Sequence, residues 1–76
     1  MSEVNHSRHN VLRLSQVISK SGLSRSSIYQ LMADGEFPKQ INLGPRAVGW
    51  LESEVQQWID SRVQSRDAEN LEHANQ

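Results

Sequence analysis

A short run of hydrogen-bonding side chains, from Arg25 to Gln30, has the residue types and spacing best suited to recognition chemistry in this 76-residue sequence. Ile28, Leu31 and Met32 follow the i, i+3, i+4 spacing of one helix face, which leaves the polar side chains on the other face. Arginine can donate two hydrogen bonds to guanine, glutamine can bridge adenine, and a helix fits the major groove of double-stranded DNA. The pattern therefore predicts a helix that reads DNA, the alternative being an ordinary solvated helix face.

We expect contacts to DNA from this helix and from the segment that follows it. Tyr29 strengthens the expectation, because solubility alone would fill an exposed helix face with Glu or Lys rather than with a large aromatic residue. Lys39 at the base and Arg46 at the tip of a predicted hairpin suit a wing that contacts the sugar-phosphate backbone or the minor groove, although a lone arginine at a turn is more often only solvated. The residues predicted to bind DNA are Ser24, Arg25, Ser26, Ser27, Tyr29, Gln30, Lys39 and Arg46.

Two short helices joined by a tight turn are predicted to position the polar face. The first has Ser15 as its predicted N-cap and ends at Gly22, since glycine readily adopts the left-handed conformation that closes a helix. The second follows the predicted N-cap Ser24 and closes at residues 34–35. So short a connection forces the helices to cross steeply with Leu23 between them, which is a helix-turn-helix pattern.

A β-hairpin is predicted over residues 40 to 50. Polar and apolar side chains alternate on both sides of a turn of about four residues, residues 44–47, which places Arg46 at the tip. A two-stranded ribbon is marginally stable alone, so the hairpin must pack on the helices. In the alternating pattern of the hairpin, Trp50 falls on the side that faces the helices. We therefore assign this residue to the core rather than to base stacking.

A helix of about 15 residues is predicted from Glu52 onward. Its apolar face is marked by Val55, Trp58, Ile59 and Val63. Trp58 is assigned to the core for the same reason as Trp50. Acidic residues at the start and arginines near the end of this segment favour a helix through their interaction with its dipole.

Length and composition leave room for a single small domain. The chain contains 36% hydrophobic residues and no cysteine, so the core must hold together by packing rather than by disulfides. Residues 1–10 and 67–76 are polar and lack periodicity, and we expect flexible tails there, the second of them acidic. The expected fold is a mainly α winged helix-turn-helix with a small β-hairpin, over residues 11–66.

Catalytic, metal and membrane roles are not expected. The sequence lacks a glycine-rich phosphate loop and a GxSxG motif, and the chain is too short to enclose a dry active site. His6 and His9 have the spacing of metal ligands on a helix, but no carboxylate pair converges with them, so we expect neither a metal ion nor a cofactor. No apolar run approaches the roughly 20 residues that span a bilayer, and we expect a cytoplasmic protein.

The net charge of −1 hides an uneven distribution. Through Leu51 the chain carries six Lys or Arg residues against three acidic ones, and the remainder carries two Arg against six acidic residues. The basic first part favours a polyanionic partner such as DNA, whereas the acidic second part favours a protein partner. Two ordinary solvated faces are the alternative interpretation of the charges alone.

Three motifs occur in order between residues 11 and 62. They are GLSRSSIY at 22–29, which Leu14-Ser15 precede, GEFPK at 35–39, and VGWLESEV at 48–55, which Trp58-Ile59 follow. This combination is far more specific than a single helix-turn-helix string, and it resembles the AlpA family of prophage regulatory proteins.

The resemblance implies a MerR-like winged helix related to phage excisionases. It implies DNA contacts on the helix from Arg25 to Gln30 and on the wing around Arg46, at an attachment site or a promoter. It also implies either activation of a neighbouring integrase gene or a direct role as excisionase, with several copies assembled on DNA. The competing hypothesis is a protein-interaction module that contacts integrase or RNA polymerase through the acidic segment 52–72, with incidental DNA binding; an excisionase could combine both roles, since it would touch integrase as well as DNA.

Overall fold

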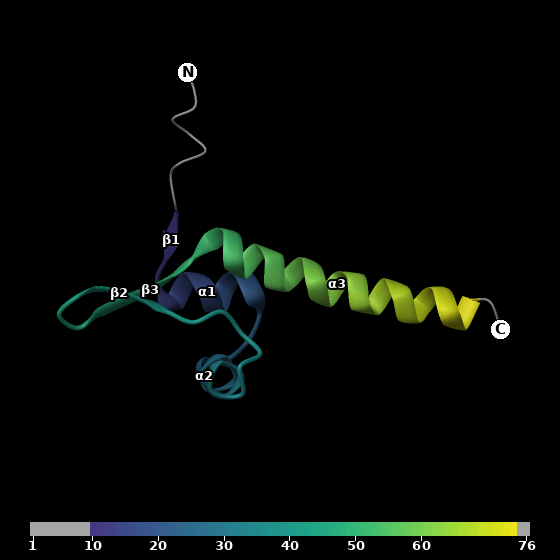
Figure 1. Cartoon of the computed structure of the whole chain (residues 1–76), viewed down its shortest axis with the longest axis horizontal. Coiled ribbons are helices and arrows are strands. Elements are labelled where there is room, and N and C mark those ends of the chain that lie inside the picture. Colours follow the sequence, from purple (N-terminus) through teal and green to yellow (C-terminus); the bar gives the residue numbers. More distant parts are fainter. Residues whose placement is uncertain (1–9, 75–76) are drawn as a thin grey trace, which may run out of the picture.

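The computed structural model describes residues 10–74 of the chain, with side chains described for residues 10–69. It contains three helices and a small antiparallel sheet, which confirms the expected mainly α winged helix-turn-helix (Figure 1). The hairpin extends at one end of the long axis and the last helix at the other. The elements in chain order are β1 (Val11–Leu12), α1 (Leu14–Ser21), α2 (Arg25–Ala33), β2 (Ile41–Gly44), β3 (Ala47–Leu51) and α3 (Glu52–Ala74).

The connection between α1 and α2 has the predicted caps. Gly22 adopts a φ of 76°, and its N–H donates to the carbonyl of Ile18. Ser24 precedes α2, and its Oγ accepts a hydrogen bond from the Ser27 amide at 3.2 Å. Figure 1 shows α1 from the side and α2 almost end-on, so the two helices cross steeply as expected. Leu23, between them, packs against the core.

The prediction that Ser15 caps α1 is wrong, because the helix begins before it and Arg13 is the N-cap residue. The Arg13 carbonyl accepts from the amides of Gln16 at 2.9 Å and Val17 at 3.0 Å. In return, the Gln16 Oε1 accepts from the Arg13 amide at 2.8 Å. A glutamine three residues after the cap thus satisfies the cap amide, and the helix starts without a serine.

The sheet has three strands in the order β1-β3-β2, both pairs being antiparallel. β1 is too short to show any alternation, and the sequence did not predict it. Leu12 pairs with Trp50, and beyond the strand the Glu52 amide donates to the Asn10 carbonyl at 2.8 Å. The expected two-stranded hairpin therefore gains a third strand from the segment that precedes the helix-turn-helix.

The hairpin turn places Arg46 at its tip, as predicted. Pro45 and Arg46 form the turn, and Arg46 has a φ of 62°, a conformation that non-glycine residues rarely adopt. The pairing register shifts between Asn42 and Gly44, and the Asn42 Oδ1 accepts from the Gly44 amide at 3.2 Å. This irregularity ends the regular pairing just before the tip.

The core contains side chains from α1, α2, β3, α3 and the segment before β2. The buried hydrophobic residues are Val17, Ile28, Phe37, Trp50 and Val55. Trp58 is half-buried against this cluster, its ring meets Phe37 edge-on at 5.0 Å between centroids, and its Nε1 donates to the Glu36 carbonyl at 2.7 Å. The assignment of both tryptophans to the core is therefore confirmed.

α3 has 23 residues, rather than the expected 15 or so. Only its first turns contact the body of the domain, since Val55 is buried, Ile59 is half-buried, and every side chain from Asp60 to Glu69 is exposed. The added residues 67–74 include good helix formers such as Ala68 and Glu69, whose exposed side chains allow the helix to continue into solvent. Residues 67–74, expected to lie in a tail, are thus helical, while the division into domain and tails stays a prediction. None of the described helices combines the length and apolar character that crossing a membrane requires.

Candidate nucleic-acid interface

α2 turns one face to solvent and the other to the core. Ile28 is fully buried, and Leu31 and Met32 are half-buried against the core cluster. On the opposite side, positions i, i+1, i+4, i+5 and i+8 are exposed, which is one continuous helix face. This α2 face carries Arg25, Ser26, Tyr29, Gln30 and Ala33.

Two of the predicted contact residues are held by aromatic packing. Tyr29 is 37% exposed, and its ring meets the fully buried Trp50 edge-on at 6.3 Å between centroids. The Arg25 guanidinium carbon lies 5.9 Å from the centroid of the Tyr29 ring, within the range of a cation–π contact. The core thereby orients Tyr29, and Tyr29 in turn orients Arg25.

The serines at the start of α2 differ in what they bond. The Ser24 hydroxyl accepts from the Ser27 amide and donates to the Ser27 Oγ at 3.0 Å, so it is engaged in capping the helix. Ser26 lies on the exposed α2 face. The predicted DNA contacts of Ser24 and Ser27 would therefore have to form alongside the cap.

Gln30 is exposed and only loosely held. Its Nε2 lies 3.4 and 3.5 Å from the two carboxylate oxygens of Asp34, at the long end of the hydrogen-bond range. The amide can therefore turn outward to a ligand at small cost. Such an amide offers both a donor and an acceptor, which is the pairing that an adenine edge requires.

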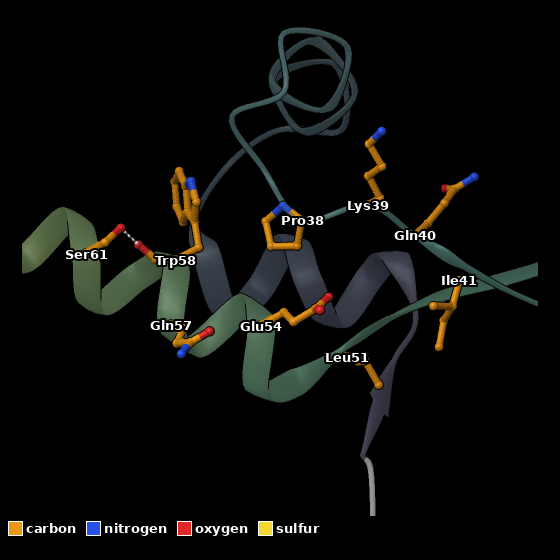
Figure 2. Close-up of a pocket in the computed structure, with 9 residues that line it drawn as sticks. All are labelled: Pro38, Lys39, Gln40, Ile41, Leu51, Glu54, Gln57, Trp58 and Ser61. Carbon is orange, nitrogen blue, oxygen red and sulfur yellow. Dashed lines mark hydrogen bonds between the residues drawn. The ribbon is translucent and has the colours of Figure 1, made fainter.

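Lys39 joins α2 to the base of the hairpin. A groove of about 390 Å³ runs between them and is lined by Tyr29, Met32, Ala33, Lys39 and Gln40. Figure 2 shows the Lys39 side chain directed toward α2. Glu54 belongs to α3 and lies on the opposite side of Pro38 from Lys39. The structure thus places Lys39 beside the α2 face, and it places Arg46 apart from it at the tip of the hairpin.

Arg13 is a further exposed cation beside the hairpin, although the sequence offered no reason to select it. It is exposed, and its Nε donates to the carbonyl of Val48 in β3 at 3.1 Å. The guanidinium therefore lies where the start of α1 meets the hairpin. Its only sequence signal is its charge, because the contact to Val48 spans 35 residues.

Four of the five described basic residues outside α3 lie on α2, beside it, or on and next to the hairpin. Lys20 is the exception, since its Nζ lies 3.9 Å from a carboxylate oxygen of Glu52 at the start of α3. Among the described side chains, Arg13, Arg25 and Arg46 form no ion pair with the acidic residues of α3, whereas Lys20 contacts Glu52 and Lys39 lines a hollow with Glu54. The four basic residues on or beside α2 and the hairpin are Arg13, Arg25, Lys39 and Arg46.

The histidines considered as metal ligands cannot be placed. His6 and His9 lie outside the described residues. Among the described side chains, those of residues 10–69, no group of three His, Cys, Asp or Glu lies close enough together to hold a metal ion.

Comparison with known proteins establishes the family. Residues 10–63 match the model of the prophage CP4-57 regulatory protein (AlpA) family, and this segment covers both the α2 face and the hairpin. The chain belongs to the AlpA family. Every one of the eight predicted DNA-binding residues lies within the part that matches AlpA.

Two relatives support the assignment to the AlpA family. The chain is 49% identical over 55 residues to the uncharacterized protein ORF88 of Enterobacteria phage P4, and the match covers 72% of this chain and 62% of that protein. It is 39% identical over 64 residues to a protein of Escherichia coli (strain K12) named DNA-binding transcriptional activator AlpA, covering 76% of this chain and 91% of the relative. The chain thus spans less than two thirds of the phage protein. No solved structure is significantly similar to it.

Proposed function

We propose that this protein binds double-stranded DNA at specific sites, with α2 in the major groove. The α2 face carries the proposal, because Arg25, Tyr29 and Gln30 are exposed on a helix whose opposite side is fixed in the core. Arginine and glutamine are the side chains that form paired hydrogen bonds to guanine and adenine. The first turns of the helix, which hold Arg25 and Ser26, would lie nearest the base edges.

The other basic residues would hold the phosphate backbone. Lys39 lies beside Tyr29, and Arg13 is fixed between α1 and the hairpin, so both would flank α2 in the groove. Arg46 at the hairpin tip would contact the backbone or the adjacent minor groove. Such contacts set orientation and affinity but carry little sequence information.

The biological role we propose is regulation of a prophage or genomic island. It is supported by membership of a family of prophage regulatory proteins and by the name of the Escherichia coli relative, a DNA-binding transcriptional activator. A neighbouring integrase gene is the proposed target. Direct action as an excisionase, with integrase as partner, is the finer alternative, and both roles use the same DNA-binding surface.

Footprinting of the purified protein tests the proposal. The probes are the promoter of the neighbouring integrase gene and the attachment site of the element. Protection of the promoter supports a role in transcription, and protection of the attachment site supports excision. Protection of neither at low salt would contradict site-specific binding.

A protein-interaction role for α3 is the second candidate. Every side chain from Asp60 to Glu69 is exposed, and acidic residues predominate from Glu52 onward. Such a surface suits a basic patch on integrase or RNA polymerase. If purified protein produces no gel shift on either probe at low salt, this role becomes the better explanation of the molecule.

A further inference from the structure

The outer face of the three-stranded sheet, defined as the face opposite Trp50, carries only apolar residues. The side chains of Trp50 and its pairing partner Leu12 point to the core. Because side chains alternate along a strand, the residues next to Trp50 in β3 and next to Leu12 in β1 point to the outer face. The register pairs Val11 with Leu51 and Ile41 with Gly49 on that outer side. The outer face comprises Val11, Ile41, Leu43, Ala47, Gly49 and Leu51.

Gly49 allows two of these side chains to meet across the middle strand. A Cβ atom at Gly49 would lie 2.5 Å from Val11 Cγ1 and 3.1 Å from Leu43 Cδ1, so the two side chains occupy the space above it. Even so, Val11 is 36% exposed and Leu43 is 44% exposed. None of the larger side chains of the outer face belongs to the hydrophobic cluster around the core. The outer face is therefore continuous and apolar, with Val11 and Leu43 exposed on it and Ile41, Ala47 and Leu51 half-buried.

We infer that the outer face is the contact between two copies of this chain bound side by side on DNA, an inference that rests on the proposed function. A lasting complex in free solution buries about 20–30 residues on each side, far more than this face offers. A neighbour that DNA already holds at short range needs much less contact, because its effective concentration is high. With few cations on its DNA-binding surface, a single copy also gains most from such a neighbour.

The charges at the two ends of the outer face favour a second copy as the occupant. Arg46 lies at the tip end, and Glu54 lies at the other end, where it lines a hollow of about 830 Å³ together with Ile41 and Leu51 (Figure 2). Lys39 lines the same hollow, but its side chain is directed toward α2. A two-fold axis that lies between the two faces and runs across the strands makes the strands of the two copies run in opposite directions. Arg46 of each copy then approaches Glu54 of the other copy. The exposed Leu43 of each copy approaches the hollow of the other copy. Since a guanidinium has five N–H donors, Arg46 can bond a phosphate and a carboxylate together.

Dilution of isotope-labelled protein tests the contact without DNA. Starting from about 1 mM, we expect amide shifts that change with concentration only on the outer face, in line with a weak interface. The double variant V11T/L43T should abolish these changes, and its β-branched side chains retain strand propensity. V63T is the matched control, because Val63 is 41% exposed on α3, outside the face. Concentration-dependent shifts elsewhere, or none at the highest concentration, would overturn the inference.

Titration of duplexes with one and two copies of the footprinted sequence tests the same contact on DNA. We expect the wild-type protein to bind the second site about ten-fold more tightly than an isolated site. V11T/L43T should lose this gain while its affinity for a single site stays within about two-fold. E54K, a substitution on an exposed helix position, should also lose it, because it places like charge against Arg46 of the other copy. A folded variant that keeps the full gain in affinity would overturn the inference. Failure of the wild-type protein to bind any DNA would instead overturn the proposed function. In that case the dilution experiment alone would decide whether the two copies contact each other.

Discussion

At the scale of single residues, buried side chains determine how firmly exposed ones are held. Trp50, which has no exposed surface, supports the Tyr29 ring, and that ring supports Arg25. Arg46 instead extends from a two-residue turn with a φ of 62°. This contrast favours base-specific contacts from α2 and sequence-independent contacts from the hairpin tip.

Arg46→Ala should therefore weaken binding to every DNA sequence by a similar factor. Loss of one phosphate contact lowers the slope of log affinity against log salt by about 1. Titrations at several salt concentrations measure this slope. Arg62→Ala is the control, since Arg62 lies on α3 over the Trp58 ring and should leave the slope unchanged. An unaltered slope for Arg46→Ala would remove the hairpin tip from the interface.

Trp58→Phe should lower the free energy of unfolding by roughly 1 kcal/mol or somewhat more. The substitution keeps an aromatic ring beside Phe37 but leaves the Glu36 carbonyl without the indole N–H that it accepts at 2.7 Å. Urea unfolding measures the change. Tyr29→Phe removes only the hydroxyl of a residue that is 37% exposed and should leave stability unchanged, so equal effects from the two substitutions would contradict this role of Trp58.

At the scale of elements, α2 depends on its cap. Ser24→Ala should cost about 1 kcal/mol of stability, because the Ser27 amide loses the hydroxyl that caps the helix. Ser26→Ala is a matched control, since it removes an exposed serine from the same helix without touching the cap. Thermal unfolding of the two variants measures the difference. A Ser24→Ala variant as stable as Ser26→Ala would show that the cap contributes little.

The elements that the sequence predicted are those determined by local signals. Gly22, Ser24 and the spacing of Ile28 and its neighbours define the helix-turn-helix, and the turn before Ala47 defines the hairpin. β1 was missed because it depends on a tertiary contact, and it forms only because β3 provides a partner strand. The start of α1 at Arg13 was missed although its signal is local, because the cap is an arginine bonded reciprocally with Gln16 rather than a serine.

The residues of the candidate site also divide into those that the local sequence predicts and those that only the fold reveals. Helical spacing alone identified the α2 face, whose side chains are exposed as expected. Spacing could not identify Arg13, because its position depends on a hydrogen bond to a strand 35 residues away. Nor could it show that the outer face of the sheet is apolar, since that face combines residues from three strands whose register only the fold determines.

At the scale of the whole molecule, α3 carries most of the acidic residues and extends away from the part of the domain that holds the predicted DNA-binding residues (Figure 1). Truncation after Ser65 should change the melting temperature little, because the described side chains of the removed part are exposed. Affinity for DNA should rise by a few-fold at low salt, since the removed segment carries net negative charge. Thermal unfolding and fluorescence anisotropy measure the two effects. A loss of DNA affinity would instead place the end of α3 in the interface.

The ratio of specific to non-specific DNA affinity tests the central claim most directly. It is measured by titrating the footprinted duplex and a scrambled duplex with wild-type protein and with the Arg25→Ala, Gln30→Ala and Arg46→Ala variants. We predict that Arg25→Ala and Gln30→Ala each lose roughly 1–3 kcal/mol on the specific duplex and little on the scrambled one, so that the ratio collapses. Arg46→Ala should weaken both duplexes and preserve the ratio. Equal, sequence-independent losses in all three variants would contradict the assignment of α2 as the reading helix.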